Sequence, residues 1–74
     1  MKNYRFSVII EKDKDGYYAY APDLKGCYSQ GDSYEEVVEN IKDAIRLHVE
    51  YLVESGEVID VSDNVSLTSL EVAV

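Results

Sequence analysis

Residues 26–33, which read GCYSQGDS, come within one residue of a phosphate-binding loop. Such a loop follows the pattern G-x-x-x-x-G-K-[ST] and opens a helix, and the residues after Ser33 have a helical pattern. The lysine that would contact the phosphates is replaced by Asp32. Because Glu35 and Glu36 follow closely, carboxylates occupy the helix end that a phosphate would need. We interpret the two glycines as turn residues at the ends of a short strand, and Asp32 and Ser33 as helix-capping residues.

Residues 11–16, EKDKDG, resemble the first half of a calcium-binding loop. Oxygen ligands stand at positions one, three and five of this pattern, and glycine stands at position six. Position twelve of such a loop supplies a bidentate glutamate, whereas here it is Pro22. We therefore interpret the segment as a solvated turn and predict no metal site in it.

The chain has one histidine, His48, and one cysteine, Cys27. The spacing places His48 on or beside the apolar face of the predicted helix, and no Cys, Ser or second His stands at a matching distance in the pattern. Cys27 lies in a short predicted strand without a Cys-x-x-Cys partner. We predict that both residues pack as structural side chains, and that the protein is not an enzyme and uses no cofactor.

Tyrosine is unusually frequent, with seven residues in 74. In the run YYAYA, residues 17–21, strand alternation places Tyr18 and Tyr20 on one face of a sheet and Tyr17 on the other. Tyrosine is enriched at protein interfaces. A sheet that stacks RNA bases would surround its rings with basic residues, and this chain is acidic. The pattern therefore favours a protein-binding face.

Length and charge narrow the class of protein. Seventy-four residues allow a single domain over residues 1–74, with a small core. The net charge of −8 repels nucleic acid and favours a basic partner. One cysteine cannot form an internal disulfide, so we expect self-association into a homo-oligomer, with dimer and tetramer both open. No apolar run suits a membrane span or a signal peptide, so we expect a cytoplasmic protein that does not bind membranes.

The hydrophobic periodicity predicts the order β-β-β-α-β, an α+β fold with one long helix on one face of a sheet. Residues 4–11 and 17–21 alternate as strands around the Asp-Gly hairpin signal, and residues 26–30 form a third strand. A helix follows over 33–55, and residues 67–74, LTSLEVAV, read as a fourth strand that returns to the sheet. Whether residues 57–66 are ordered stays open.

The helix carries its own start and stop signals. Ser33 and Glu36 form a capping box, in which the hydroxyl and the carboxylate each accept a hydrogen bond from an otherwise unpaired backbone N–H. Gly56 can adopt the left-handed conformation that ends a helix.

Three linked stretches resemble the HicB-type antitoxin family: YAYAPDLKGC at 18–27, SQGDSYEEV at 29–37 and ENIKDAI at 39–45. That family has a strand that ends in a Pro-Asp-Leu-x-Gly-Cys turn, a Gly-Asp-Ser/Thr helix start, and a helix that reads Glu-Glu-Ala-x-x-Asn-Ile-x-x-Ala. The stretches agree in order and spacing as one continuous block.

The resemblance implies a HicB-like fold similar to a truncated ribonuclease H domain. It also implies a partner, a small basic HicA-type toxin that cleaves messenger RNA, which the antitoxin binds so that the toxin's active site is covered or displaced. Longer family members carry a C-terminal DNA-binding module, and we expect this chain to be a short form that lacks it. The likeness to ribonuclease H does not imply nuclease activity, because the first predicted strand has Glu11 as its only acid.

The leading hypothesis is therefore an antitoxin that binds and neutralises a HicA-type toxin. The alternatives are a stand-alone oligomeric interaction module of the same fold, and a metal-dependent nuclease that uses the hairpin carboxylates or His48. We predict that the toxin-binding residues are the aromatic anchors Tyr18, Tyr20 and Tyr28, with complementary charge from Asp13, Asp15, Asp23 and Asp32.

Overall fold

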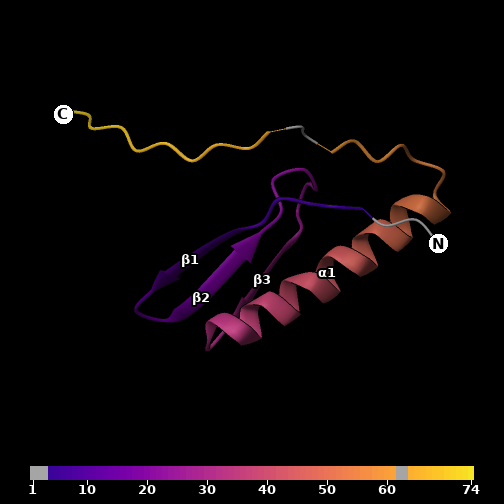
Figure 1. Ribbon diagram of the computed structural model, residues 1–74, viewed down its shortest axis with the longest axis horizontal. Helices are drawn as coiled ribbons and strands as arrows, with labels where there is room; N and C mark the ends of the chain where they lie inside the picture. Colours follow the sequence, from indigo (N-terminus) through magenta and orange to yellow (C-terminus); the bar gives the residue numbers. More distant parts are fainter. Residues whose placement is uncertain (1–3, 62–63) are drawn as a thin grey trace.

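The structure is a computed structural model that describes residues 4–61 and 64–74. Three antiparallel strands, β1 (Ile9–Asp13), β2 (Gly16–Tyr20) and β3 (Tyr28–Gly31), precede one helix, α1 (Tyr34–Glu54). The strands form a meander in the order β1-β2-β3, and α1 runs along one face of it (Figure 1). The predicted α+β class and the order of these four elements are confirmed.

The β1–β2 hairpin turns at the predicted Asp-Gly signal. Asp13 pairs with Gly16, so that Lys14 and Asp15 form a two-residue loop. The N–H of Asp15 donates a hydrogen bond to Asp13 Oδ1 at 2.8 Å. Gly16 has a φ of +133°, which side chains of L-residues rarely allow. The reversal therefore depends on an Asx turn and one glycine.

The loop between β2 and β3 is held by its own backbone. Ala21 N–H donates to the Cys27 carbonyl at 3.1 Å, Leu24 N–H to the Ala21 carbonyl at 3.1 Å, and Cys27 N–H to the Leu24 carbonyl at 3.2 Å. Gly26 has a φ of +77°, so its predicted role as a turn residue is confirmed. These bonds satisfy the backbone while Leu24 and Cys27 are buried.

Both predicted ends of the helix are confirmed. Ser33 Oγ accepts from the N–H of Glu36 at 3.1 Å, and Glu36 Oε1 accepts from the N–H of Asp32 at 3.2 Å. The carboxylate thus reaches one residue further back than a standard capping box. At the other end Gly56 has a φ of +73°, and Glu57 N–H donates to the Leu52 carbonyl at 3.0 Å. Within the described residues, no helix has the length and apolar character needed to cross a membrane.

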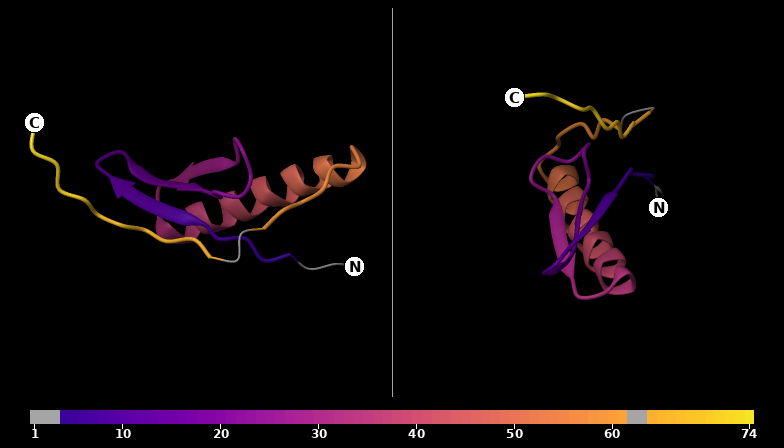
Figure 2. Two further views of the ribbon diagram at one scale, coloured as in Figure 1. Left: turned by 90° about the horizontal axis from the view of Figure 1, so that it is seen from above. Right: turned by 90° about the vertical axis from the view of Figure 1, so that its left-hand side faces the viewer.

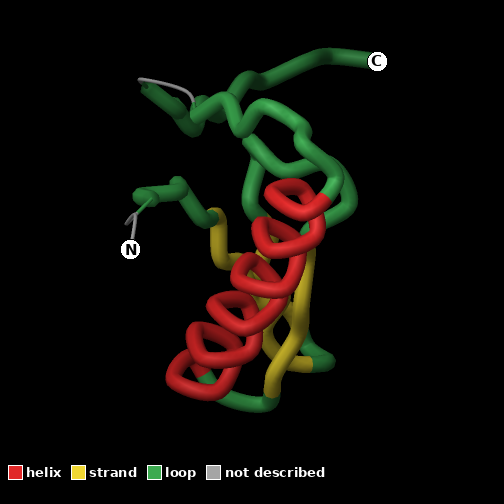
Figure 3. The backbone as a smooth tube through the Cα atoms, turned by 90° about the vertical axis from the view of Figure 1, so that its right-hand side faces the viewer, coloured by secondary structure: helices red, strands yellow, loops and turns green. Residues whose placement is uncertain are grey.

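The core lies between α1 and the sheet (Figure 3). Its fully buried members come from the meander, from the β2–β3 loop and from the first half of the helix: Ala19, Ala21, Leu24, Cys27, Val37 and Ile41. Gly31 allows the closest approach, because a Cβ built on it would lie 2.7 Å from the backbone nitrogen of Val37. Gly31 ends β3 at the predicted strand end, but its φ is not positive, so glycine is needed there for the space that the helix backbone takes.

The predicted fourth strand over residues 67–74 is wrong. Residues 64–74 form no strand, and every residue from 66 to 74 is exposed. Figures 1 and 2 show this segment running apart from the sheet. Its alternating valines and leucines favour an extended backbone, but a strand also needs a paired edge, and the segment does not reach one in the single chain. Of the first predicted strand, residues 4–8 likewise precede the paired part.

Candidate protein-binding face

Three tyrosines gather on the face of the sheet that α1 leaves uncovered. Tyr20 on β2 stands opposite Tyr28 on β3, and Tyr18 lies two residues before Tyr20 on the same face. The ring centroids of Tyr18 and Tyr28 are 6.0 Å apart with an interplanar angle of 26°, and those of Tyr18 and Tyr20 are 5.9 Å apart. We call Tyr18, Tyr20 and Tyr28 the tyrosine cluster.

The tyrosine cluster is accessible although its rings contact one another. Tyr28 is 59% exposed and Tyr18 39% exposed, and Tyr20 is half-buried. A shallow hollow of about 370 Å³ joins the cluster to the β2–β3 loop, where Pro22 and Lys25 line it. The folded sheet already holds these rings in place. A partner that binds them therefore causes little further loss of side-chain entropy.

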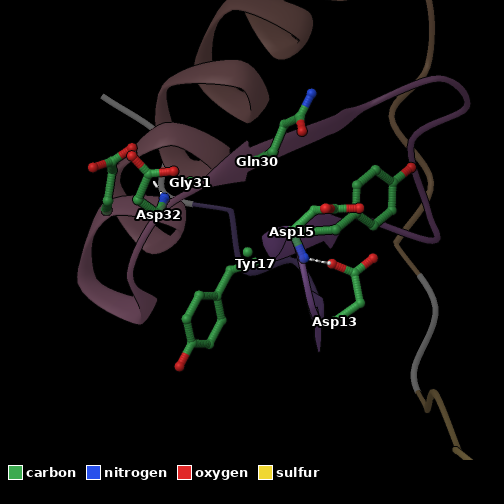
Figure 4. A pocket seen from close by; sticks show the side chains of 9 residues that line it. Asp13, Asp15, Tyr17, Gln30, Gly31 and Asp32 are labelled. Carbon is green, nitrogen blue, oxygen red and sulfur yellow. Dashed lines mark hydrogen bonds between the residues drawn. The ribbon is translucent and has the colours of Figure 1, made fainter.

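Carboxylates gather beside the cluster, at the end of the sheet where the β1–β2 hairpin meets the start of α1. An open hollow of about 390 Å³ lies there, and Figure 4 shows Asp13 and Asp15 on one side of it and Asp32 on the other. Glu36 and Tyr18 also line this acidic hollow. Because Tyr18 belongs to both features, the tyrosine cluster and the acidic hollow form one continuous surface.

Asp23 does not join the other three aspartates. It lies in the β2–β3 loop, at the opposite end of the sheet from the hairpin, and it is half-buried whereas Asp13, Asp15 and Asp32 are exposed. The meander explains this, because successive turns of an antiparallel meander lie at opposite ends of the sheet.

The arrangement can be compared with known proteins. The profile of the family described as HicB_like antitoxin of bacterial toxin-antitoxin system matches residues 6–72. The chain belongs to the HicB-like antitoxin family. A UPF0150 protein of Synechocystis is 44% identical over 61 residues, which cover 81% of this chain and 77% of the relative. Another UPF0150 protein, from Thermotoga maritima, is 40% identical over 76 residues and 97% of each chain.

A solved structure agrees with the family assignment. A chain of a HicA3 and HicB3 toxin-antitoxin complex superposes on this HicB-like chain with a TM-score of 0.63 and 27% sequence identity. The match covers 78% of this chain and 70% of that chain. The resemblance seen in the sequence is therefore confirmed by the family profile and by the fold.

Neither Cys27 nor His48 joins a metal-ligand cluster in the part of this HicB-like chain that the structure describes. Cys27 is buried, and desolvation by burial raises the pKa of its thiol, which disfavours the nucleophilic thiolate. His48 is half-buried on α1. Among the described residues no three His, Cys, Asp or Glu side chains are placed to hold a metal ion together, so the metal-dependent nuclease hypothesis finds no ligand set there.

Glu36 and Gln30 are among the residues of the acidic hollow that were not predicted from the sequence. Glu36 was interpreted only as a capping residue, yet its carboxylate also lines the hollow; its place in the first helical turn, next to the Asp32 that ends the loop, was the available signal. Gln30 lines the hollow from β3. Its carbonyl accepts a hydrogen bond from Asn40 Nδ2 at 2.9 Å, which ties β3 to the helix.

Proposed function

We propose that this HicB-like chain binds and neutralises a small basic HicA-type toxin, and that the tyrosine cluster and the acidic hollow form the contact surface. The fold neighbour is part of a HicA3 and HicB3 complex. The net charge of −8 suits a basic partner. We propose the cytoplasm as the place of this interaction, because the toxin's messenger RNA substrate is there.

The proposal depends on one observation: the aromatic tyrosine cluster and the charged acidic hollow form a continuous surface. Aromatic rings supply most of the energy of many protein interfaces, whereas charges around them set the association rate and exclude wrong partners. Tyr18 joins such an aromatic surface to a group of exposed carboxylates. The helix occupies the other face of the sheet, so this surface stays free for a partner.

The same surface suggests how binding would inhibit the toxin. A ribonuclease binds the phosphate backbone through Lys and Arg side chains. Carboxylates of the acidic hollow would pair with those cations, while the tyrosine cluster would exclude water around them. The antitoxin would then compete with RNA for the toxin's basic surface, and this chain itself would bind no nucleic acid.

The test uses any small basic HicA-type protein encoded beside this chain, with affinity measured by calorimetry and toxin activity by RNA cleavage. Tyr18→Ala should weaken binding about 30-fold and release cleavage, because a central aromatic anchor contributes about 2 kcal/mol. Tyr51→Ala is the matched control, since Tyr51 is 65% exposed but lies on the helix, away from the cluster. Equal effects of the two variants would contradict the proposed surface.

The charge contribution has a separate test. The double variant Asp13→Asn and Asp15→Asn should slow association and flatten its dependence on salt, because it removes charge from the rim of the interface. The control variant Glu57→Gln and Asp60→Asn removes the same charge from exposed residues beyond the helix. If no neighbouring basic protein binds the wild type at all, the stand-alone interaction module becomes the better hypothesis.

A further inference from the structure

The single chain exposes more surface than a folded protein of its mass. Its accessible surface is 6355 Å², about 1,700 Å² more than the roughly 4,600 Å² typical of an 8.4 kDa monomer. Its radius of gyration is 14.3 Å, against about 11 Å for a compact chain of this length. A stable protein interface removes about 800 Å² from each partner, so the excess on one chain is ample for an interface with a second copy.

Much of the excess lies in residues 64–74, which we call the tail. Leu67, Leu70, Val72 and Val74 are 85%, 84%, 74% and 121% exposed. In an extended backbone Leu70, Val72 and Val74 fall on one face. The tail is therefore an apolar segment with strand-forming residues that the single chain leaves in water.

A second unburied region lies along the last half of α1. The helix has 21 residues and is about 31 Å long, whereas a strand of five residues spans about 17 Å. Ile45 and Val49 are only partly buried against the core and Val53 is exposed, and with Tyr4 and Phe6 these three helix residues line an open groove of about 800 Å³. The buried helix residues Val37 and Ile41 both belong to the first half.

The sheet also has one open edge next to this groove. On β3, the carbonyl of Gln30 accepts from Asn40, which partly covers that edge. The outer side of β1 pairs with no other strand in the described part of the chain. An unpaired edge strand is a template for an added strand. Residues 4–8 continue from this edge along the groove.

We propose that two copies of this chain exchange tails, so that the tail of each pairs with the β1 edge of the other and places Leu70, Val72 and Val74 in its groove. In the single chain the tail lies apart from its own edge (Figures 1 and 2). A reciprocal exchange supplies each copy with the strand and the apolar cover that it lacks, under two-fold symmetry.

Charge permits this contact on an otherwise acidic molecule. The rim of the groove holds Lys42 and Arg46 against Glu50 and Glu54, so it is neutral on a chain of net charge −8. Glu71 is the only charged side chain of the tail, and Lys42 on the rim could pair with it, whereas Arg46 Nη2 already lies 3.4 Å from Asp43 Oδ1. The exchange does not involve the tyrosine cluster, which lies on the opposite face, so the inference does not depend on the toxin-binding proposal.

Sedimentation analysis of matched variants tests the exchange. The wild type should dimerise, and Leu70→Asp should raise the dimer dissociation constant by about 100-fold or more, because it would bury an unpaired charge. Ser69→Asp adds the same charge on the other face of the tail and should dimerise like the wild type. Leu70 is 84% exposed in the single chain, so Leu70→Asp should keep the helical circular dichroism.

The groove has its own pair of variants. Val53→Gln should weaken the dimer about tenfold, because it loses apolar area in the groove, whereas Leu47→Gln should not. Val53 and Leu47 are 58% and 62% exposed, and only Val53 lines the groove. A wild type that stays monomeric at all concentrations, or a dimer that tolerates Leu70→Asp and Val53→Gln, would overturn the proposal.

Isotope-filtered NMR on a mixture of labelled and unlabelled protein distinguishes exchange from folding back within one chain. We expect nuclear Overhauser effects between the methyl groups of Val72 in one copy and the ring of Phe6 in the other. Effects confined to one copy would show that the tail covers its own groove, and would overturn the exchange.

Discussion

The two faces of strand β2 differ in how far their side chains are buried, although residues of the two faces alternate along the strand. Ala19 is completely buried beneath α1, while Tyr18 and Tyr20 beside it in sequence lie on the open face. Directly beneath the helix the closed face carries the small side chain of Ala19, so that the helix can approach within van der Waals contact. The open face carries large rings that already contact one another.

This difference separates residues that stabilise the fold from residues that would bind a partner. A substitution on the closed face disturbs the close packing between the sheet and α1, so it should lower the free energy of unfolding. A change on the open face removes area that is still hydrated in the free protein, so it should mainly lower affinity for a partner. Each of the following predictions tests one side of this contrast.

The largest effect is expected for Gly31→Val on the closed face. A Cβ at Gly31 would lie 2.7 Å from Val37 N and 3.2 Å from Glu36 C, and backbone atoms cannot move aside as a flexible side chain can. We expect a loss of about 3 kcal/mol or more in the free energy of unfolding, measured by urea denaturation.

Gly56→Ala is the control for this variant. No atom lies within 4 Å of a Cβ at Gly56, so only its φ of +73° disfavours alanine, at a cost of about 1 kcal/mol. A Gly31→Val protein as stable as the Gly56→Ala protein would mean that the helix does not approach the sheet so closely.

Val37→Ala should remove about 2 kcal/mol from the free energy of unfolding, because Val37 is 0% exposed and its two lost methyl groups leave a cavity. Thermal and urea denaturation would measure this loss. Val58→Ala is the matched control: Val58 is 83% exposed, and its replacement should change stability by less than about 0.5 kcal/mol.

Tyr28→Ala should show the opposite behaviour on the open face. We expect its affinity for the toxin to fall about tenfold, or about 1.4 kcal/mol, while its unfolding free energy changes by less than about 1 kcal/mol. Tyr28 is 59% exposed, so little packing is lost. A large loss of stability with unchanged affinity would reverse the assignment of the two faces.

The smallest effect concerns Cys27 and pH. Burial raises the pKa of this thiol in the folded protein, so the unfolded chain loses its proton at lower pH than the folded chain. Stability from this group is full below the ordinary pKa of a cysteine and declines as the pH rises from there through the raised value. Cys27→Ser should reduce this alkaline decline in thermal denaturation, and alkylation of Cys27 should be slow until urea unfolds the protein.

The parts of the fold that the sequence predicted are the parts specified by neighbouring residues. The Asp-Gly hairpin, the Ser33 cap and the Gly56 stop each depend on hydrogen bonds or dihedral angles within a few residues. Strand alternation likewise placed Tyr18 and Tyr20 on one face and Tyr17 on the other, where its ring lies 6.4 Å from that of Tyr34.

The misplaced features all depend on contacts between distant segments. Gly31 was interpreted as a turn residue, and only the approach of Val37 shows why a side chain is excluded there. Asp23 was grouped with the hairpin carboxylates, although the meander places it at the other end of the sheet. No pattern within residues 67–74 could indicate that they would lack a partner strand.

By itself, then, the sequence determined the order of the three strands and the helix, the faces on which Tyr17, Tyr18 and Tyr20 lie, and the family. Only the tertiary structure decided which carboxylates share a hollow with Tyr18, that the groove along the second half of the helix stays open, and that residues 64–74 join no strand. Local patterns encode hydrogen bonds and dihedral angles of adjacent residues, whereas a binding surface and an unpaired edge arise from the packing of segments that are far apart in the chain.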